Sequence, residues 1–162
     1  MKPLRLKMQA FGSYGKETTI DFEKVNQNLF LITGDTGAGK TTIFDAIVFA
    51  LYGEASSSLN KKEGVVLQSQ YVDFDSEPYV ELVFSEDRDE KREIYTVRRV
   101  PRHLKTITRG ANKGKPKENT GSVSLIMPDG LEYPSKEADR KLQETVGPVS
   151  YTHLRAHETS LH

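Results

Sequence analysis

The sequence is constrained most by a glycine-rich segment that lies between an apolar run and a helical pattern. The run Leu29–Ile32 predicts a buried strand, because continuous apolar residues suit a parallel strand that is covered on both faces. From Gly34 to Thr41 the spacing is Gly-x-x-x-x-Gly-Lys-Thr, which is that of a phosphate-binding loop. Its glycines allow positive φ and a close approach of the backbone to a ligand. A strand, this loop and a helix in succession predict a nucleoside triphosphate site.

The chemistry of this site divides between the backbone and two side chains. Successive N–H groups of the loop cradle phosphate oxygens, and the helix that follows turns its free N–H groups and positive dipole end toward the same anion. Lys40 is expected to reach the outer phosphates of ATP, and the Thr41 hydroxyl is expected to hold Mg²⁺. The predicted phosphate-binding residues are Gly34, Asp35, Thr36, Gly37, Ala38, Gly39, Lys40, Thr41 and Thr42.

Composition limits the class of protein. A chain of 162 residues is long enough for one domain with a core. The 23 Lys and Arg residues balance 23 Asp and Glu residues, so the net charge gives no argument for nucleic acid. There is no cysteine, which excludes disulfides and thiolate metal sites and fits a reducing cytoplasm. No apolar run approaches membrane-spanning length, so we expect a soluble intracellular protein without a membrane partner.

Hydrophobic periodicity predicts the strands. The segment Leu4–Phe22 has the alternation of an antiparallel pair. Tyr79–Phe84 and Ile94–Val100 are predicted as two more strands, joined by an exposed hairpin tip at Ser85–Glu90. A further strand is predicted at Ser122–Met127, where a turn sequence follows.

Two helices complete the prediction. Apolar residues at Ile43–Leu51 cover most of a helix circumference, which indicates a helix in the interior that Gly53 ends. Ser135 is expected to cap a helix at Lys136–Val146, and Gly147 to end it. The predicted fold class is α/β, with a mixed sheet and antiparallel hairpins around a buried helix that follows the phosphate loop.

One stretch is strongly basic. No acid lies between Arg98 and Lys117, whereas acids concentrate between Asp73 and Glu93. A nucleic-acid backbone contact is one interpretation, because each neutralised phosphate releases counterions. A solvated loop rich in Gly and Lys at Arg109–Pro116 is the other, since no aromatic residue is present for stacking on bases. The candidate DNA contacts are Arg98, Arg99, Arg102, Lys105, Arg109, Lys113, Lys115 and Lys117.

Several segments together carry a family resemblance, namely Leu4–Tyr14, Thr19–Phe22, Leu31–Gly53, Val80–Phe84 and Tyr95–Arg99. In these segments the chain resembles the SbcC family, the ATPase subunits of bacterial SbcCD exonucleases in the SMC-like branch of ABC ATPases. The resemblance covers the chain up to about Gly147 and is most specific around Phe11–Tyr52. It implies that residues 1–147 are the N-terminal ATPase lobe of a head, truncated before a long coiled coil.

The resemblance also implies the partners and the setting. In this family two heads sandwich two ATP molecules, and their engagement regulates a partner nuclease in DNA repair. The implied partners are the C-terminal lobe of the same protein, a second SbcC head, an SbcD-type nuclease subunit and DNA, in the bacterial cytoplasm at the nucleoid. Ser13 matches a serine that is an additional nucleotide contact, although this chain has Gly12 where relatives often carry arginine. The remaining catalytic motifs lie beyond this segment, so the chain alone is expected to bind ATP without hydrolysing it.

Residues 148–162 depart from the preceding pattern. Pro148–Thr159 resembles the translation of a transposon-end sequencing adapter, so we expect 148–162 to be a non-native tail. The alternative is a metal site, because His153 and His157 have the i, i+4 spacing of helical metal ligands.

Two other functions fit a phosphate-binding loop. One is a small-molecule or nucleoside kinase, which needs a lid arginine and an acceptor pocket. The other is a binding module that holds a nucleotide and never turns it over. Sustained heptads downstream of Gly147 are the feature that distinguishes the SMC-like interpretation from both.

Overall fold

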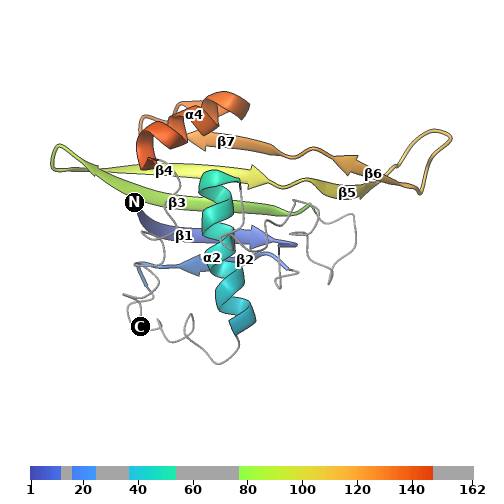
Figure 1. Ribbon diagram of the computed structural model, residues 1–162, viewed down its shortest axis with the longest axis horizontal. Coiled ribbons are helices and arrows are strands. Elements are labelled where there is room, and N and C mark those ends of the chain that lie inside the picture. The colour runs from blue at the N-terminus through green and yellow to red at the C-terminus, as the bar shows by residue number, and fades with distance from the viewer. Residues whose placement is uncertain (12–15, 25–36, 54–76, 148–162) are drawn as a thin grey trace.

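An antiparallel sheet with two helices on one face makes up most of the described structure (Figure 1). The computed structural model describes residues 1–11, 16–24, 37–53 and 77–147, and for residues 37–42 the backbone alone. The elements in chain order are β1 (Lys2–Gln9), β2 (Thr18–Asp21), α2 (Gly37–Tyr52), β3 (Tyr79–Arg88), β4 (Lys91–Val100), β5 (His103–Thr106), β6 (Pro116–Asn119), β7 (Ser122–Ile126), β8 (Glu132–Pro134) and α4 (Ser135–Val146).

The main sheet has six strands in the order β2-β1-β3-β4-β7-β8. Strand β1 lies between β2 and β3, with Leu6 opposite both Ile20 and Leu82. The predicted pairing within Leu4–Phe22 is therefore confirmed, as are the strands predicted from Tyr79, Ile94 and Ser122. Every pairing between described strands is antiparallel. The parallel strand expected at Leu29–Ile32, which would make the sheet mixed, lies outside the described residues.

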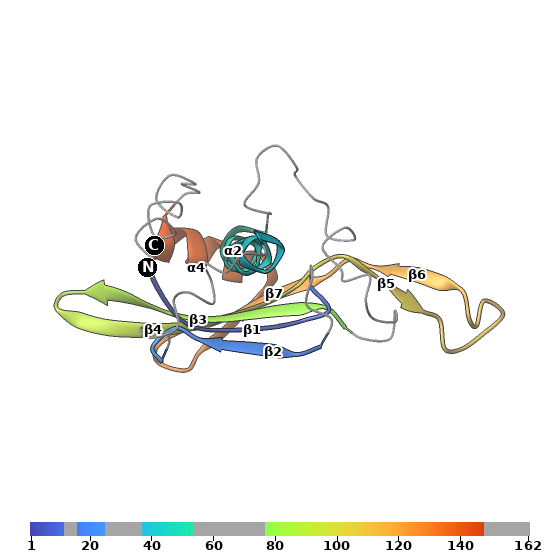
Figure 2. The same ribbon diagram turned by 90° about the horizontal axis from the view of Figure 1, so that it is seen from below.

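The sheet is built to bury one face. Along β1, Leu4, Leu6 and Met8 are buried, while Arg5 between them is exposed. Both helices lie on the buried side, and no helix of the described chain covers the other side (Figure 2). On that open side polar residues face each other across strands, as Lys7 and Glu81 do. An antiparallel sheet with one face in water gives this alternation.

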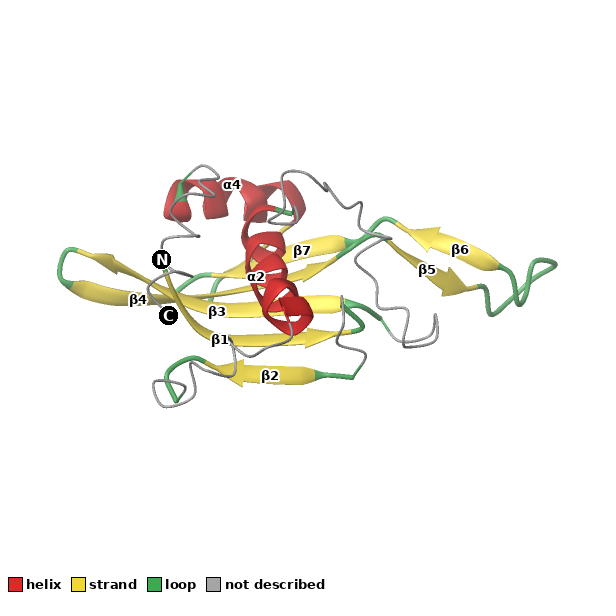
Figure 3. Cartoon of the chain, turned by 60° about the horizontal axis from the view of Figure 1, so that its bottom comes forward, coloured by secondary structure: helices red, strands yellow, loops and turns green. Residues whose placement is uncertain are grey.

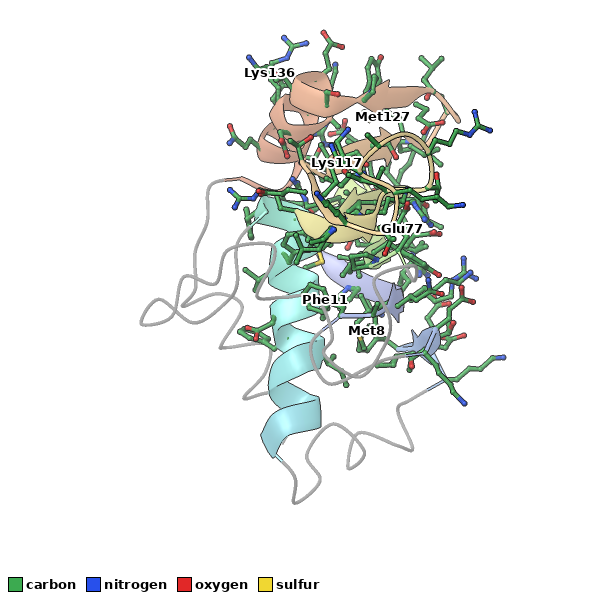
Figure 4. The ribbon with its side chains drawn as sticks, turned by 90° about the vertical axis from the view of Figure 1, so that its right-hand side faces the viewer. Met8, Phe11, Glu77, Lys117, Met127 and Lys136 are labelled. Atoms are coloured by element: carbon green, nitrogen blue, oxygen red, sulfur yellow. The ribbon has the colours of Figure 1, made fainter. Side chains whose placement is uncertain are left out.

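Helix α2 crosses the strands of the sheet and supplies much of the core (Figure 3). Its residues from Ile43 to Leu51 are buried except Phe44, as the apolar circumference predicts. Phe49 packs against Phe11 with 5.5 Å between ring centroids, and Figure 4 shows Phe11 beside this helix. Each large apolar side chain buried here contributes about 1.5–3 kcal/mol. The predicted end is confirmed, since the Gly53 N–H donates to the Phe49 carbonyl at 2.8 Å and Gly53 has φ 77°.

The β3–β4 hairpin differs from its prediction. The sequence predicts an exposed tip at Ser85–Glu90, but the strands continue through this segment and only Asp89 and Glu90 form the turn. Both turn residues have positive φ, 50° and 66°, as a two-residue type I′ turn requires. The prediction is wrong because the ladder pairs backbone groups and continues through polar sequence. Opposite charges such as Asp87 and Arg92 face each other across it.

Helix α4 begins differently from its prediction and ends as predicted. Pro134 is the N-cap residue and makes no side-chain capping bond, so the prediction of Ser135 as the cap is wrong. Ser135 is instead the first helical residue, with φ 56°. At the other end the Gly147 N–H donates to the Gln143 carbonyl at 2.9 Å, and Gly147 has φ 80°. Ala138 and Leu142 attach this helix to the core.

Candidate functional site

The motif predicted to bind phosphate, Gly34–Thr41, overlaps the beginning of α2. The helix starts at Gly37, so the backbone of Gly37, Ala38, Gly39 and Lys40 forms its first turn. The first four N–H groups of a helix have no partner inside the helix and are available to an anion. The other predicted contacts, Gly34, Asp35, Thr36 and Ser13, lie outside the described residues, as do the side chains of Lys40, Thr41 and Thr42.

The opposite end of α2 is held by Arg99 of β4. Arg99 is only 8% exposed, because positions 95, 97 and 99 of this strand all face the helices. Its Nε–H donates to the carbonyl of Ala50 at 3.2 Å, and its Nη2 lies 2.6 Å from Oδ1 of Asp139 in α4. The guanidinium also lies 5.9 Å from the ring centroid of Phe49. Arg99 thus serves a carbonyl in the last turn of α2, where a cation is electrostatically favoured.

Arg98 points to the open face of the sheet and is surrounded by acids. Its guanidinium carbon lies 4.0 Å from the ring centroid of Tyr79. Its terminal nitrogens lie 3.7 Å from Glu81 and 3.8 Å from Glu77. Much of its charge is therefore balanced within the chain. Arg98 and Arg99 are adjacent in sequence yet serve opposite faces of the same sheet.

Tyr79 has a strongly shifted titration. Its hydroxyl donates to Oε2 of Glu17, which ties β3 to the residues just before β2. Burial, followed by the hydrogen bond and the charge of Glu17, raises the pKa of Tyr79 from 10.0 to about 12. Arg98 lowers this pKa and Glu81 raises it, with smaller effects.

The rest of the basic stretch forms a two-stranded ribbon and the tip that joins its strands. Strands β5 and β6 pair from His103 opposite Asn119 to Thr106 opposite Pro116. The ribbon projects from one end of the main sheet, away from both helices (Figures 1 and 2). Its tip closes through the Ile107 N–H and the Lys115 carbonyl at 2.9 Å. The segment 109–116, for which the sequence offers a solvated loop, lies at this tip.

Two residues set the junction between the ribbon and the sheet. Pro101 follows β4 directly, and proline cannot donate to a strand ladder. Gly121 precedes β7 with φ 83°, and a Cβ there would lie 2.4 Å from the Val100 carbonyl oxygen. His103 is fully buried beside this junction, with Nδ1 2.9 Å from the Pro101 carbonyl oxygen and no partner for Nε2 among the described residues. The close approach of these backbones fixes where the ribbon leaves the sheet.

The ribbon gathers five exposed cations, Lys105, Arg109, Lys113, Lys115 and Lys117. None of the five makes an ion pair within the described ranges. Lys105 lies directly opposite Lys117, so both point to the same face of the ribbon. The acid Glu118 points to the other face and pairs with Arg102 at 2.8 Å. The eight candidate DNA contacts thus divide into a buried residue, two paired arginines and five uncompensated cations.

A cleft of about 580 Å³ lies at the root of the ribbon. It is lined by the end of α2, the two links to the ribbon and the beginning of α4, including Arg99, Arg102, Lys136 and Asp139. Asp139 balances Arg99, and Glu118 balances Arg102, which leaves Lys136 as the lining cation that no ion pair among the described residues balances. Sequence reasoning missed this junction. The signal that marks it is the alternation of Tyr95, Val97 and Arg99, which places the arginine on the apolar face of β4.

The described part of the chain has neither a cluster of metal ligands nor a membrane-spanning helix. The residues that the structure describes contain no group of three His, Cys, Asp or Glu side chains that could hold a metal ion. His153 and His157 lie outside those residues. Among the described helices, neither is long and apolar enough to cross a membrane.

Comparison with known proteins agrees with the family resemblance seen in the sequence. The sequence matches the family described as an AAA domain over residues 5–147. It is 58% identical over 74 residues to the C subunit of the nuclease SbcCD from Staphylococcus epidermidis, covering 45% of this chain and 7% of that protein. The corresponding protein of Staphylococcus saprophyticus is 48% identical over 85 residues, covering 52% and 8%. The resemblance to SbcC is confirmed, and the matched segment is less than a tenth of each relative's length.

Proposed function

Because the chain belongs to the AAA domain family, we propose that it binds ATP and Mg²⁺ at the N-terminal end of α2. The observation that carries this proposal is the overlap of the Gly34–Thr41 motif with the start of that helix at Gly37. In this assignment the backbone from Gly34 to Thr42 surrounds the phosphates, Lys40 meets the outer ones and Thr41 holds Mg²⁺. Ser13 is an additional nucleotide contact in the same proposal.

The broader proposal is the N-terminal lobe of a DNA repair ATPase. The relatives are named as subunits of a nuclease, which supports a role in DNA metabolism. In this role the chain joins a C-terminal lobe of the same protein, a second head and an SbcD-type nuclease, in the bacterial cytoplasm. Engagement of two ATP-bound heads then regulates the nuclease. Residues 148–162 remain assigned to a non-native tail.

Calorimetry of Mg-ATP binding tests the nucleotide site. Lys40→Ala removes the compact positive charge that meets the outer phosphates. We expect at least a roughly tenfold loss of affinity, equivalent to about 1.4 kcal/mol. Lys91→Ala at the β3–β4 turn is the matched control, because it removes an exposed lysine remote from the motif. Equal ATP affinities for wild type and Lys40→Ala would reject the site.

Turnover distinguishes the proposal from its alternatives. Hydrolysis needs groups that position water and hold Mg²⁺ beside Thr41, and in this proposal those come from the other lobe and the second head. We expect background phosphate release from the chain alone and activity after mixing with a matching C-terminal lobe. Turnover by the chain alone, abolished by Lys40→Ala, would favour a kinase. ATP binding without turnover in the mixture would favour a pure binding module.

The ribbon supports a second part of the proposal, a contact with DNA. The five exposed cations on β5, β6 and their tip lie where a polyanion can reach them together. A two-stranded ribbon also has the dimensions that the major groove of B-DNA accepts. Arg99 is left out of this contact because it is buried, and Arg98 and Arg102 contribute less because acids pair with them.

Salt dependence tests the DNA contact. Substituting Arg109, Lys113, Lys115 and Lys117 together with Gln should reduce the log–log salt slope by up to about 3.6, at about 0.9 per lost phosphate contact. A control variant removes three exposed cations, Arg88, Lys91 and Arg92, at the β3–β4 turn, the opposite end of the sheet (Figure 1). An unchanged slope in the ribbon variant would restore the solvated-loop interpretation.

A further inference from the structure

Arg99 connects the two helices of the described chain through a single guanidinium. One edge of the guanidinium serves α2 through the Ala50 carbonyl, at 3.2 Å from Nε. A second edge of the guanidinium bonds to α4, where Nη2 donates to Oδ1 of Asp139 at 2.6 Å. A planar guanidinium can hold two partners in fixed directions at once, whereas a lysine ammonium cannot reproduce that geometry. The link therefore depends on arginine rather than on positive charge alone.

The two ends of α2 have different surroundings. The N-terminal end carries the phosphate-binding motif, and the C-terminal end carries Ala50 and Gly53. At about 1.5 Å per residue, the 16 residues of α2 separate these ends by about 24 Å. A buried helix transmits a displacement along its length because its packed interior has low compressibility. A displacement of the motif end would therefore reach the carbonyl to which Arg99 is bonded.

The surroundings of Arg99 allow a displacement of α2 to be transmitted to α4. Its Nη1 lies close to Gly53, where an added Cβ would come within 3.2 Å, so it borders the end of α2 directly. The cleft of about 580 Å³ borders Arg99 and Asp139, so one side of the pair is not enclosed by packed side chains. The short bond to Asp139 is charge-assisted on both sides and resists separation. If a shift of Ala50 carries the guanidinium with it through the 3.2 Å bond, the shorter ion pair carries the shift on to α4.

We infer that Arg99 is a positioning residue that couples ligand binding at the N-terminal end of α2 to the stability of α4. The inference rests on the proposed ATP site, and it adds a responding element at the far end of the helix. By linkage, a ligand that favours one position of α2 also favours the arrangement of α4 that matches it.

Hydrogen exchange of the full chain, with and without saturating Mg-ATP, tests this coupling. In wild type we expect Mg-ATP to slow exchange of the α4 amides by about fivefold or more. Arg99→Lys and Asp139→Ala should each abolish that difference. ATP affinity measured by calorimetry should stay within about threefold of wild type, because neither residue lies at the motif end.

A neighbouring ion pair provides the control. Glu137 lies in the first turn of α4 and pairs with Arg140 at 3.4 Å, with both side chains more than half exposed. Glu137→Ala removes a carboxylate from the same helix without touching Arg99, and should retain the ATP-dependent protection. Circular dichroism of each variant checks that the fold is kept, because Asp139→Ala leaves the buried guanidinium of Arg99 without its carboxylate, whereas Arg99→Lys keeps the positive charge.

The outcomes separate this inference from the proposed function. If wild type binds Mg-ATP and α4 exchange does not change, the coupling is wrong and the ATP site stands. If Arg99→Lys and Asp139→Ala respond as wild type does, Arg99 is not the link. If wild type shows no ATP binding by calorimetry, the proposed function fails and the inference fails with it.

Discussion

Lys105 and Lys117 lie directly opposite each other across the β5–β6 ribbon, and both are exposed. Like charges in register on a two-stranded ribbon repel each other and destabilise the pairing. Neither lysine has an acid partner within the described part of the chain. The repulsion between the two lysines destabilises the ribbon in the free protein. It also favours the binding of a polyanion, which would neutralise both charges together.

Lys117→Glu should therefore stabilise the ribbon and weaken DNA binding. The new opposite-charge pair with Lys105 should contribute about 0.2–1 kcal/mol to the ribbon. Hydrogen exchange of the β5 and β6 amides measures the first effect, and fluorescence anisotropy with a duplex measures the second. Lys136→Glu makes the same charge change on α4 and should alter neither ribbon exchange nor, beyond a small general effect, duplex affinity. A ribbon that exchanges faster in Lys117→Glu would contradict this account.

Asp139→Ala should destabilise the whole chain. The substitution leaves the buried guanidinium of Arg99 without its carboxylate, and the loss of a hydrogen bond to a charged group costs about 1.5–3 kcal/mol. Urea unfolding followed by circular dichroism measures the difference. Glu137→Ala breaks an exposed pair on the same helix and should cost less than about 1 kcal/mol. Similar losses in the two variants would mean that the Arg99 bond adds nothing beyond a surface pair.

Tyr79 should make stability depend on pH in alkaline solution. The pKa of Tyr79 is about 12 in the folded chain and 10.0 ordinarily, so folding favours the protonated phenol. The contribution of Tyr79 to the free energy of unfolding is fully present below pH 10 and is lost as the pH rises from about 10 toward 12. Urea unfolding across this range should show a steeper loss of stability in wild type than in Tyr79→Phe. Tyr133→Phe removes a phenol from β8 instead and serves as the control. Identical pH dependence in wild type and Tyr79→Phe would reject the assignment.

Gly121→Ala should damage the junction between the sheet and the ribbon. Gly121 has φ 83°, and its added Cβ would lie 2.4 Å from the Val100 carbonyl oxygen and 3.0 Å from the Pro101 carbonyl carbon. Gly130 has φ 89° and no atom within 4 Å of the equivalent position. Gly130→Ala therefore isolates the cost of positive φ, about 1–2 kcal/mol. Gly121→Ala adds a backbone clash and should cost more than about 4 kcal/mol in urea unfolding. Equal costs would show that the junction relaxes freely.

Much of the fold could be predicted from sequence because its signals are local. The alternation of Leu4, Leu6 and Met8 gives a strand with one buried face, and the apolar circumference of residues 43–51 gives a buried helix. Gly53 and Gly147 end their helices through positive φ, which a glycine in that position predicts. Boundaries were less predictable. Ser135 is a residue type that often caps helices, and Ser85–Glu90 is as polar as an exposed hairpin tip. Polarity alone does not reveal which backbone groups form hydrogen bonds, so both boundaries were predicted wrongly.

The sequence by itself determined the phosphate-loop spacing, the strand and helix periods and the family, since each depends on residues close together along the chain. Only the tertiary structure decided the roles of the basic residues. Arg98 and Arg99 have the same charge and adjacent positions, but β4 turns one toward Tyr79 and the other toward Asp139, 40 residues away. Burial and ion pairing depend on which distant strand or helix lies opposite a side chain. That information arises only when α2, α4 and the ribbon are assembled on the sheet.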